Sequence, residues 1–413
     1  MDCLLPLLFM GQPELLPPHA LNPPPQLENP SPSFLSEEKT LYGAPFSNQV
    51  YSENFAVGWK DGDATPADAD AALRALETTW KALIEERKWQ APVSSDRHYI
   101  WVILTPDLSG TGFTTTYKDS NFPQGYPVIY LNPNYSQDRD FWASLSAHEM
   151  AHAVQYSYRD YATNSEEPWY WEASAEWQSE LALPQNNSYG YQSIHYSDQP
   201  HLRYSSMENN HQYGMFVLNA YLEEHLEGPG SVRRIWELSQ DQPDAHWGEL
   251  ISEAMGSKIG AIVAGMANKM SRLDFEDGQH YIAPQRISGL SDGHSGKLAY
   301  LGTHYLDSQD GARVTAQGEV LLSTNSGVGN QVFLRAGETL AVTGLHPSST
   351  AYSLSVSPWI ASNDSGIDTG GARESPTGGC ACKSPSSQKA PTGIFAALCL
   401  LFLRRRTLRL SLD

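Results

Sequence analysis

The spacing of apolar residues predicts several long helices in the middle of the chain. In segment 67–89 the apolar positions recur about every three to four residues, as on one face of an amphipathic helix. The same spacing predicts a helix over 138–160. A further helix is expected after Ser165, with Pro168 in its first turn, where the missing N–H of proline costs nothing. From 211 to 275 the pattern remains helical.

Runs rich in β-branched and aromatic residues predict strands on both sides of these helices. Segments 52–60 and 97–106 are expected to be strands, the second of them buried. Segment 127–135 is shorter and contains proline, which is typical of a strand at the edge of a sheet. Beyond about residue 277, short alternating runs separated by Gly, Ser and Asn predict an all-β module of roughly 80 residues. The order of elements predicts an α+β fold class.

Composition separates this folded body from its two ends. A proline-rich tract near the start cannot form a helix or a central strand, and a Gly-, Ser- and Pro-rich tract near the end is typical of a flexible linker. We therefore divide the chain into 1–40, a leader and proline-rich linker; 41–276, the main domain; 277–360, an all-β domain; 361–391, a flexible linker; and 392–413, an apolar tail with arginines.

Charge and cysteine content exclude two classes of site. The net charge of the 413 residues is -20, and the single basic run is Arg404–Arg406, so no nucleic-acid partner is expected, because phosphate binding needs clustered Lys and Arg. All four cysteines lie near the ends, at Cys3, Cys380, Cys382 and Cys399. The body from about 40 to 360 therefore offers neither a disulfide framework nor a cysteine-rich metal site.

The candidate metal-binding and catalytic residues lie in the sequence H-E-M-A-H at 148–152, inside the predicted helix 138–160. Two histidines four positions apart project from one helix face about one turn apart, so both imidazoles can reach one tetrahedral Zn²⁺ at about 2.0–2.1 Å. Glu149 would then lie beside the open coordination position, where its carboxylate can take a proton from bound water. The histidines continue the stripe of Phe141 and Leu145 and should face inward. The alternative is a histidine pair that is only hydrogen-bonded in the core.

A tetrahedral site needs a third protein ligand beside His148 and His152. Glu172 lies on the next predicted helix, with 19 residues between it and His152. In this spacing the chain resembles the gluzincins, the metallopeptidase clan of thermolysin and the zinc aminopeptidases, whose motif is H-E-x-x-H followed after 18 or 19 residues by Glu. The resemblance implies that zinc is bound by the two histidines and Glu172. Glu166 and Glu167 are rival ligands at the helix start, where acids are common because of the helix dipole.

The resemblance extends along the helix that carries Glu172. The sequence W-E-A-S-A-E-W at 171–177 is similar to the aminopeptidase segment that contains the ligand glutamate. Glu176 shares a helix face with Glu172 and matches the acidic residue that, in this clan, hydrogen-bonds a ligand histidine and fixes its tautomer. The alternative for Glu176 is an ordinary surface carboxylate.

The sequence H-Q-Y-G at 211–214 resembles the aminopeptidase stretch in which a tyrosine three residues before a glycine stabilises the oxyanion. When the two are aligned on Gly214, that position holds His211 and not a tyrosine. Tyr213 and His211 are therefore both candidates for the oxyanion donor. The alternative is that both only pack or cap a helix.

The resemblance also implies an architecture. A zincin-like catalytic domain would span 41–276, with a mixed sheet, an active-site helix and a helical C-terminal subdomain, and a small all-β, sandwich-like domain would follow at 277–360. Such folds bind a peptide or protein substrate as an added antiparallel strand along a sheet edge. Segment 127–135, just before the active-site helix, is the candidate edge strand.

The C-terminal end carries a separate signal. The apolar run at 393–403 has 11 residues, fewer than the ~20 that span a bilayer as a helix, and an arginine cluster follows it. A Gly-Cys pair, a linker, an apolar run and arginines resemble the MYXO-CTERM sorting tail of myxobacterial surface proteins, in which the apolar tail is removed as in a GPI signal. The resemblance implies processing near Cys380 or Cys382. The alternative is a hydrophobic end with no sorting role.

This tail implies that membrane sorting machinery is a partner and that the chain is exported to the cell surface, the outer membrane or the extracellular space. The opening segment, which carries Asp2, is by itself a poor signal peptide.

Two functions of different classes fit the sequence. The first is zinc-dependent hydrolysis of peptide bonds by an exported metallopeptidase; the absence of a G-x-M-E-N run favours an endopeptidase over an aminopeptidase. The second is a non-catalytic surface binding protein, with a decayed peptidase scaffold and a ligand-binding β module. The joint presence of His148, Glu149, His152 and Glu172 favours the first.

Overall fold

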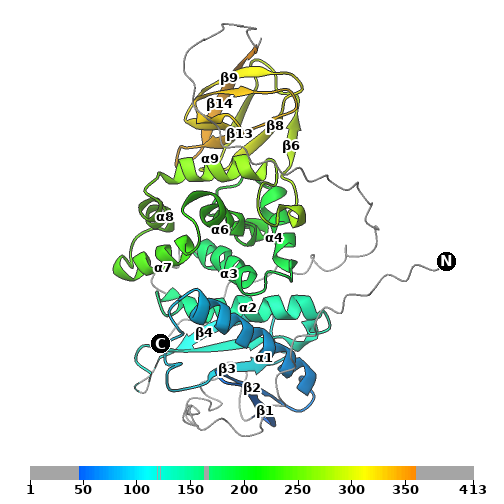
Figure 1. The fold of residues 1–413 in the computed structure, drawn as a ribbon, viewed down its shortest axis with the longest axis vertical. Coiled ribbons are helices and arrows are strands. Elements are labelled where there is room, and N and C mark those ends of the chain that lie inside the picture. Colours follow the sequence, from blue (N-terminus) through cyan, green and yellow to red (C-terminus); the bar gives the residue numbers. More distant parts are fainter. Residues whose placement is uncertain (1–45, 119, 121, 162–166, 360–413) are drawn as a thin grey trace, which may run out of the picture. The chain divides into compact units, whose positions relative to one another are not determined.

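A computed structural model describes residues 46–118, 120, 122–161 and 167–359 (Figure 1). These residues belong to one compact unit. The leader, linker and tail expected at 1–40, 361–391 and 392–413, as well as Glu166, lie outside the described residues.

A five-stranded mixed sheet forms the first part of the fold, with the strand order β1-β2-β3-β5-β4. The three inner strands are parallel to one another, whereas β1 and β4 pair antiparallel at the two ends. The strands are β1 Asn48–Tyr51, β2 Phe55–Trp59, β3 Ile100–Leu104, β4 Gly112–Tyr117 and β5 Tyr126–Leu131.

The edge of this sheet differs from our prediction. The strand expected at the edge, in segment 127–135, is β5, and it lies between β3 and β4. Pro127 is tolerated there because it precedes Val128, where the pairing of β5 with β3 begins. The edge strands are β1 and β4, and β4, which lies next to β5, is a polar, threonine-rich segment for which no strand was predicted.

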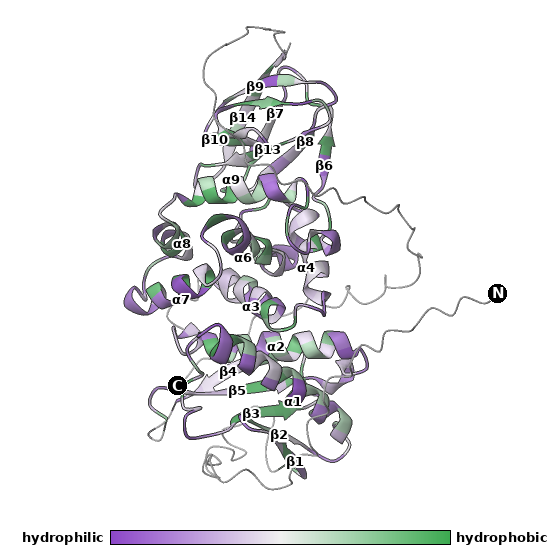
Figure 2. Cartoon of the chain, viewed as in Figure 1, coloured by the Kyte–Doolittle hydropathy of each residue, from purple (hydrophilic) through white to green (hydrophobic). Residues whose placement is uncertain are grey.

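Helices α1 (Pro66–Trp80) and α2 (Arg139–Gln155) both pack on the sheet (Figure 1). The inner strands are buried on both faces, because alternate residues of β3 belong to two separate core clusters. Figure 2 shows β3 and β5 in the green of hydrophobic residues. The sheet therefore gives α2 a rigid base.

The middle of the chain is helical, as predicted for 211–275, and shares a large hydrophobic core with α1 and α2. Helix α3 begins after Pro168, close to the predicted start, whereas α4 had not been predicted. After α2 the helices are α3 Trp169–Ala182, α4 Ser188–Ser197, α5 His211–Gly214, α6 Phe216–Tyr221, α7 Ser231–Asp241, α8 Trp247–Met255 and α9 Ile259–Met270.

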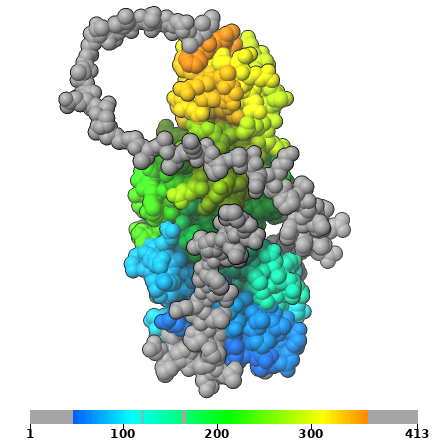
Figure 3. Space-filling model, turned by 45° about the vertical axis from the view of Figure 1, so that its right-hand side comes forward, coloured from blue at the N-terminus to red at the C-terminus, as the bar shows by residue number. Residues whose placement is uncertain are grey.

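The last described part is all-β, and its strands gather in one body, coloured yellow-green to orange in Figure 3. Its two sheets have the strand orders β11-β10-β13-β8-β6 and β12-β9-β14-β7, and they share one hydrophobic core. The strands are β6 Arg286–Ser288, β7 Ser295–Leu298, β8 Thr303–Asp307, β9 Ala312–Gln317, β10 Val320–Thr324, β11 Gly327–Gly329, β12 Gln331–Leu334, β13 Thr339–Gly344 and β14 Thr350–Pro358. The α+β class predicted for the chain is confirmed.

Within the described ranges, no single helix has the length and apolar character needed to cross a membrane; α8 and α9 pass that test only when taken together, and a bend of 81° separates them.

Candidate metal centre

Helix α2 presents two histidines one turn apart. The helix begins at Asp138, whose side chain accepts a hydrogen bond from the Phe141 N–H and so satisfies one free amide of the first turn. His148 is 8% exposed, and His152 is partly buried. Both rings face α3, which packs against α2.

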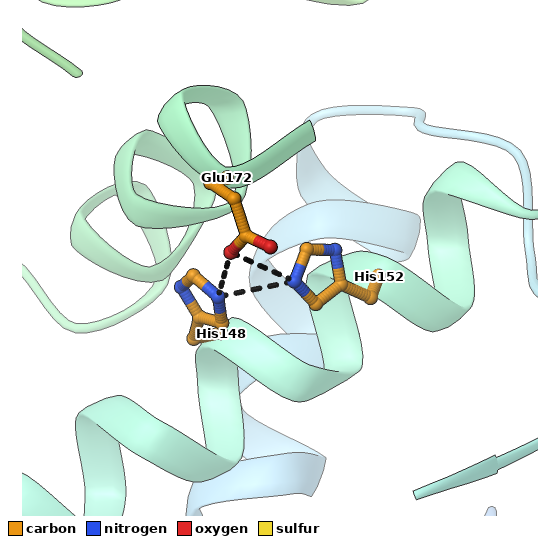
Figure 4. Close-up of side chains that lie close together, drawn as sticks. All are labelled: His148, His152 and Glu172. Carbon is orange, nitrogen blue, oxygen red and sulfur yellow. Dashed lines mark hydrogen bonds and ion pairs between the residues drawn. The ribbon is translucent and has the colours of Figure 1, made fainter. Parts of the chain in front are cut away.

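Helix α3 brings Glu172 to these histidines (Figure 4). The Glu172 Oε2 atom lies 3.3 Å from His148 Nε2 and 3.5 Å from His152 Nε2. The two Nε2 atoms are 3.1 Å apart. Four-coordinate zinc at about 2.0–2.1 Å from each ligand requires ligand atoms about 3.3 Å apart. The three side chains therefore form a group that could hold a metal ion.

The electrostatics of this group match its geometry. Burial opposes ionisation of Glu172, but hydrogen bonds and charge from His148 and His152 outweigh it and hold the pKa of the carboxyl well below its usual range. Burial likewise disfavours the charged form of His148, yet Glu176 and Glu172 raise the pKa of His148 well above its ordinary value. The group thus concentrates negative charge around two imidazoles, as a cation site requires.

Each histidine also meets a polar side chain at its other ring nitrogen. His148 Nδ1 lies 3.4 Å from Glu176 Oε1, an ion-pair distance, so Glu176 lies beside a candidate ligand histidine as expected, but the expected hydrogen bond between them is not formed within the described residues. His152 Nδ1 lies 2.8 Å from Gln155 Oε1, a contact that we had not predicted. Such contacts orient a ring toward a metal.

Glu149 lies beside the group and against the edge strand. It is 4% exposed, and burial raises the pKa of its carboxyl, although His152 and His148 oppose that rise. Thr114 of β4 has its Oγ1 atom 2.8 Å from Glu149 Oε2 and 2.8 Å from the Glu149 carbonyl oxygen. A Cβ atom at Gly112 would lie 3.1 Å from Glu149 Oε1, a tight contact, so β4 runs close to the Glu149 side chain.

The two oxyanion candidates lie in different places. The Tyr213 ring centroid is 6.0 Å from that of His148, and the negative charge of Glu172 raises the pKa of Tyr213 well above its ordinary value, with burial adding to the effect. His211 is directed toward α4: its Nδ1 atom is 3.3 Å from the His195 carbonyl oxygen, and its ring lies beside Tyr196. The structure therefore brings Tyr213, and not His211, to the candidate metal group.

Gly214 explains how this segment packs. A Cβ atom at Gly214 would clash with the backbone nitrogen of Tyr196, so α5 approaches α4 at a distance that only glycine allows. Asn209 and Asn210 both have positive φ, which asparagine tolerates better than most residues, and they turn the chain into α5.

Glu167, the described rival of Glu172, is used elsewhere. Its Oε2 atom accepts a hydrogen bond from the Trp247 N–H at 2.8 Å, and its Oε1 atom lies 3.3 Å from His246 Nδ1. It therefore caps the start of α8 and does not join the histidines.

Sequence reasoning missed Gln155, Thr114 and Gly112. Gln155 could have been found, because it lies three residues after His152 on the same helix and such residues are neighbours on a helix surface. Thr114 and Gly112 meet Glu149 only through the pairing of β4 with β5, for which the sequence carries no local signal.

Comparison with known proteins gives a family but no activity. No curated protein matches the sequence. A family model described as a family of unknown function, DUF6055, matches residues 28–314, which is more than half of the chain. The matched region contains the whole candidate metal centre and ends within β9. The chain belongs to the DUF6055 family.

Proposed function

We propose that this chain is a zinc-dependent metallopeptidase of gluzincin type. The observation that carries the proposal is the convergence of His148, His152 and Glu172, with Glu149 next to them in the sequence H-E-M-A-H. Two imidazoles and one carboxylate form a common catalytic zinc set, which leaves a coordination position open. The identity of the ion as zinc rests on this donor set.

The fold supports the same proposal. A zincin-like domain needs a mixed sheet whose antiparallel edge strand runs beside the active-site helix, and β4 contacts α2 in this way through Thr114 and Glu149. An extended substrate could pair with β4 through its main chain, which would hold a peptide without reading its sequence.

Each residue of the candidate site has a separate role in the proposed hydrolysis. A zinc ion held by His148, His152 and Glu172 would supply Lewis acidity and lower the pKa of a water molecule to about 7. Glu149 accepts a proton from the attacking water and passes it to the leaving amine nitrogen, as general base and then general acid. Thr114 keeps the Glu149 carboxylate in place during both transfers.

Tyr213 is the oxyanion donor in this proposal. A phenol is protonated at neutral pH, so the Tyr213 hydroxyl, whose ring lies beside that of His148, can donate a hydrogen bond to the carbonyl oxygen as negative charge builds there. Burial lowers the pKa of His211 to about 4, so that ring is neutral, and its hydrogen bond to the His195 carbonyl oxygen directs it to α4. We therefore favour Tyr213 over His211.

The test combines metal analysis with peptide hydrolysis. The purified full chain should contain about one zinc per molecule and should hydrolyse casein or a quenched fluorescent peptide, and a chelator should remove both properties. Glu149→Gln should keep the zinc and lower hydrolysis by about 10²–10⁴-fold, the usual contribution of a general base. Glu180→Gln, which changes a buried carboxylate elsewhere on α3, is the matched control and should hydrolyse normally.

Two results would contradict the proposal. Absence of zinc from the purified chain would contradict the proposed metal site. Equal hydrolysis by Glu149→Gln and by the unmodified protein would contradict the catalytic role of Glu149. It would favour a non-catalytic binding protein.

Export is a separate proposal, supported by the resemblance of the C-terminal tail to a surface-sorting signal. It places the peptidase at the cell surface, in the outer membrane or outside the cell. Deletion of 380–413 should move the protein from the surface fraction to another fraction in its native host. An unchanged distribution would contradict the sorting role.

A further inference from the structure

Gln155 lies fully buried between the candidate metal ligands of two helices. It is the last residue of α2, and its side chain reaches both His152 on its own helix and the backbone of α3. Its Oε1 atom is 2.8 Å from His152 Nδ1. Its Nε2 atom is 3.0 Å from the carbonyl oxygen of Trp171, the residue that precedes Glu172.

The contacts of this amide fix which end is oxygen and which is nitrogen. A backbone carbonyl accepts hydrogen bonds and cannot donate, so the atom beside Trp171 must be the NH₂ group. The second Nε2 contact is Ser174 Oγ at 3.1 Å. Ser174 donates its own hydrogen to the Tyr170 carbonyl oxygen at 2.6 Å, so its oxygen accepts from Gln155. Both N–H groups of the amide are thereby used.

The tautomer of His152 follows from this orientation. The Gln155 Oε1 atom can only accept, so His152 must carry its hydrogen on Nδ1. Its Nε2 atom then has a free lone pair, and that atom is the one that faces His148 and Glu172. A neutral imidazole binds a metal only through such a nitrogen.

We propose that Gln155 is a positioning residue that locks His152 in the metal-binding tautomer and holds the helix turn of Glu172 beside it. One amide thus links two of the three ligands, one through a side chain and the other through the carbonyl oxygen of the preceding residue. The inference rests on the metal-binding part of the proposed function and does not depend on hydrolysis.

A packing role alone would not require these contacts. Gln178 on α3 is as deeply buried as Gln155, yet within the described part of the chain neither its Oε1 nor its Nε2 atom has a hydrogen-bond partner. Burial of a glutamine in this fold therefore does not by itself produce the hydrogen bonds that Gln155 makes. Gln178 also supplies the matched control.

The first measurement is the zinc affinity of the full chain, by competition with a chromophoric chelator. Gln155→Leu keeps the approximate volume but removes the acceptor, and it should weaken zinc binding by about 10–100-fold, the usual effect of losing a partner of a ligand histidine. Gln178→Leu should bind zinc as the unmodified protein does. Equal affinity in all three proteins would overturn the proposal.

The second measurement reads the tautomer directly. In the metal-free chain labelled with ¹⁵N-histidine, at a pH where His152 is neutral, NMR should place the hydrogen of His152 on Nδ1. In Gln155→Leu a substantial fraction should shift to Nε2. A hydrogen that stays on Nδ1 in Gln155→Leu would contradict the proposed lock.

A third variant separates positioning from simple destabilisation. Gln155→Glu keeps an oxygen acceptor beside His152 but loses both donors to α3. It should be less stable to heat than the unmodified protein, yet bind zinc more tightly than Gln155→Leu. If both variants lose affinity in proportion to their loss of stability, Gln155 is only structural. If the unmodified chain binds no zinc, the proposed function fails, while the tautomer measurement still tests Gln155.

Discussion

Two buried carboxylate sites on one helix have opposite properties. Glu172, near the start of α3, contacts two histidines and has a pKa held well below its usual range. Glu180, two turns later, is 5% exposed, and burial, with the nearby charge of Asp277 adding to it, raises the pKa of its carboxyl to about 8. The same residue type on the same helix therefore holds a charge at one end and a proton at the other.

The two carboxylates differ in their partners. Imidazoles stand opposite Glu172, whereas Glu180 faces Tyr189 and the acidic residues Asp277 and Glu224. Within the described residues, Glu180 Oε2 has no hydrogen-bond partner. A carboxylate removed from water thus stays ionised only where cationic or hydrogen-bonding partners offset its desolvation.

The largest expected effect is on metal affinity. Glu172→Ala removes one of three protein ligands and should weaken zinc binding by about 10³-fold, because a zinc-binding free energy of about 10–16 kcal/mol is shared among a few ligands. Glu180→Ala is the matched control on the same helix and should leave the affinity unchanged. Chelator competition measures both. Equal losses of zinc affinity in Glu172→Ala and Glu180→Ala would show that Glu172 has no special role in zinc binding.

Zinc binding and a substitution at Glu180 should change the stability of the protein independently. Zinc at 100 times its dissociation constant should raise the free energy of unfolding by about 2.7 kcal/mol. Glu172 and Glu180 are about 12 Å apart along the axis of α3, so their effects should add. The Tm shift caused by Glu180→Gln should therefore be the same with and without zinc. A shift that disappears on zinc loading would show that the two sites are coupled.

A smaller effect should come from Glu176, which lies between the two sites on α3. Glu176→Gln keeps an oxygen beside His148 Nδ1 but removes the negative charge. Zinc affinity should fall by about 10-fold, at the low end for a partner of a ligand histidine. Zinc titrations of Glu176→Gln and of Glu180→Gln, measured by chelator competition, compare the two affinities. If Glu176→Gln binds zinc as tightly as the unmodified chain, Glu176, like Glu180, has no role in zinc binding.

The smallest expected effect is the dependence of stability on pH at Glu180. Because the pKa of this carboxyl is about 8 in the folded chain and near 4.5 when unfolded, the folded state holds more protons between these values. Its contribution to stability is complete below about pH 4.5 and is lost as the pH rises through 8. Glu180→Gln should remove that loss and raise the Tm at pH 9 by roughly 2–4 °C, the shift produced by about 1 kcal/mol.

Thermal unfolding at pH 6 and pH 9 tests this prediction. The two proteins should differ more at pH 9 than at pH 6. A difference that is larger at pH 6 would mean that Glu180 is ionised in the folded chain.

The candidate site was largely predictable because its signals are local. Helical periodicity places His148 and His152 on one face, and it also places Glu176 one turn after Glu172. The range 138–160 was predicted for the first of these helices, and α2 spans Arg139–Gln155. Glu172, on a different helix, was expected as the third candidate ligand only because its spacing from His152 resembles that of the gluzincins.

The remainder depends on contacts between distant segments. β4 is polar and threonine-rich, so its sequence resembles a loop, and only its pairing with β5 makes it the edge strand. Pro127 suggested an edge position for β5, but it lies before the parallel pairing starts. The raised pKa of Glu180 depends on its burial in the fold and on Asp277 in the turn after α9, which the sequence alone does not bring next to α3.

The edge strand β4 has a consequence for the behaviour of the protein in solution. Within the described residues its single strand neighbour is β5, and Gly112–Tyr117 contains neither proline nor a charged residue, the features that usually prevent edge strands from pairing with other chains. An edge that could admit an extended peptide can also admit the same edge of a second molecule. Concentrated protein should then self-associate through β4, and the proposed peptide hydrolysis per molecule should fall as the protein concentration rises.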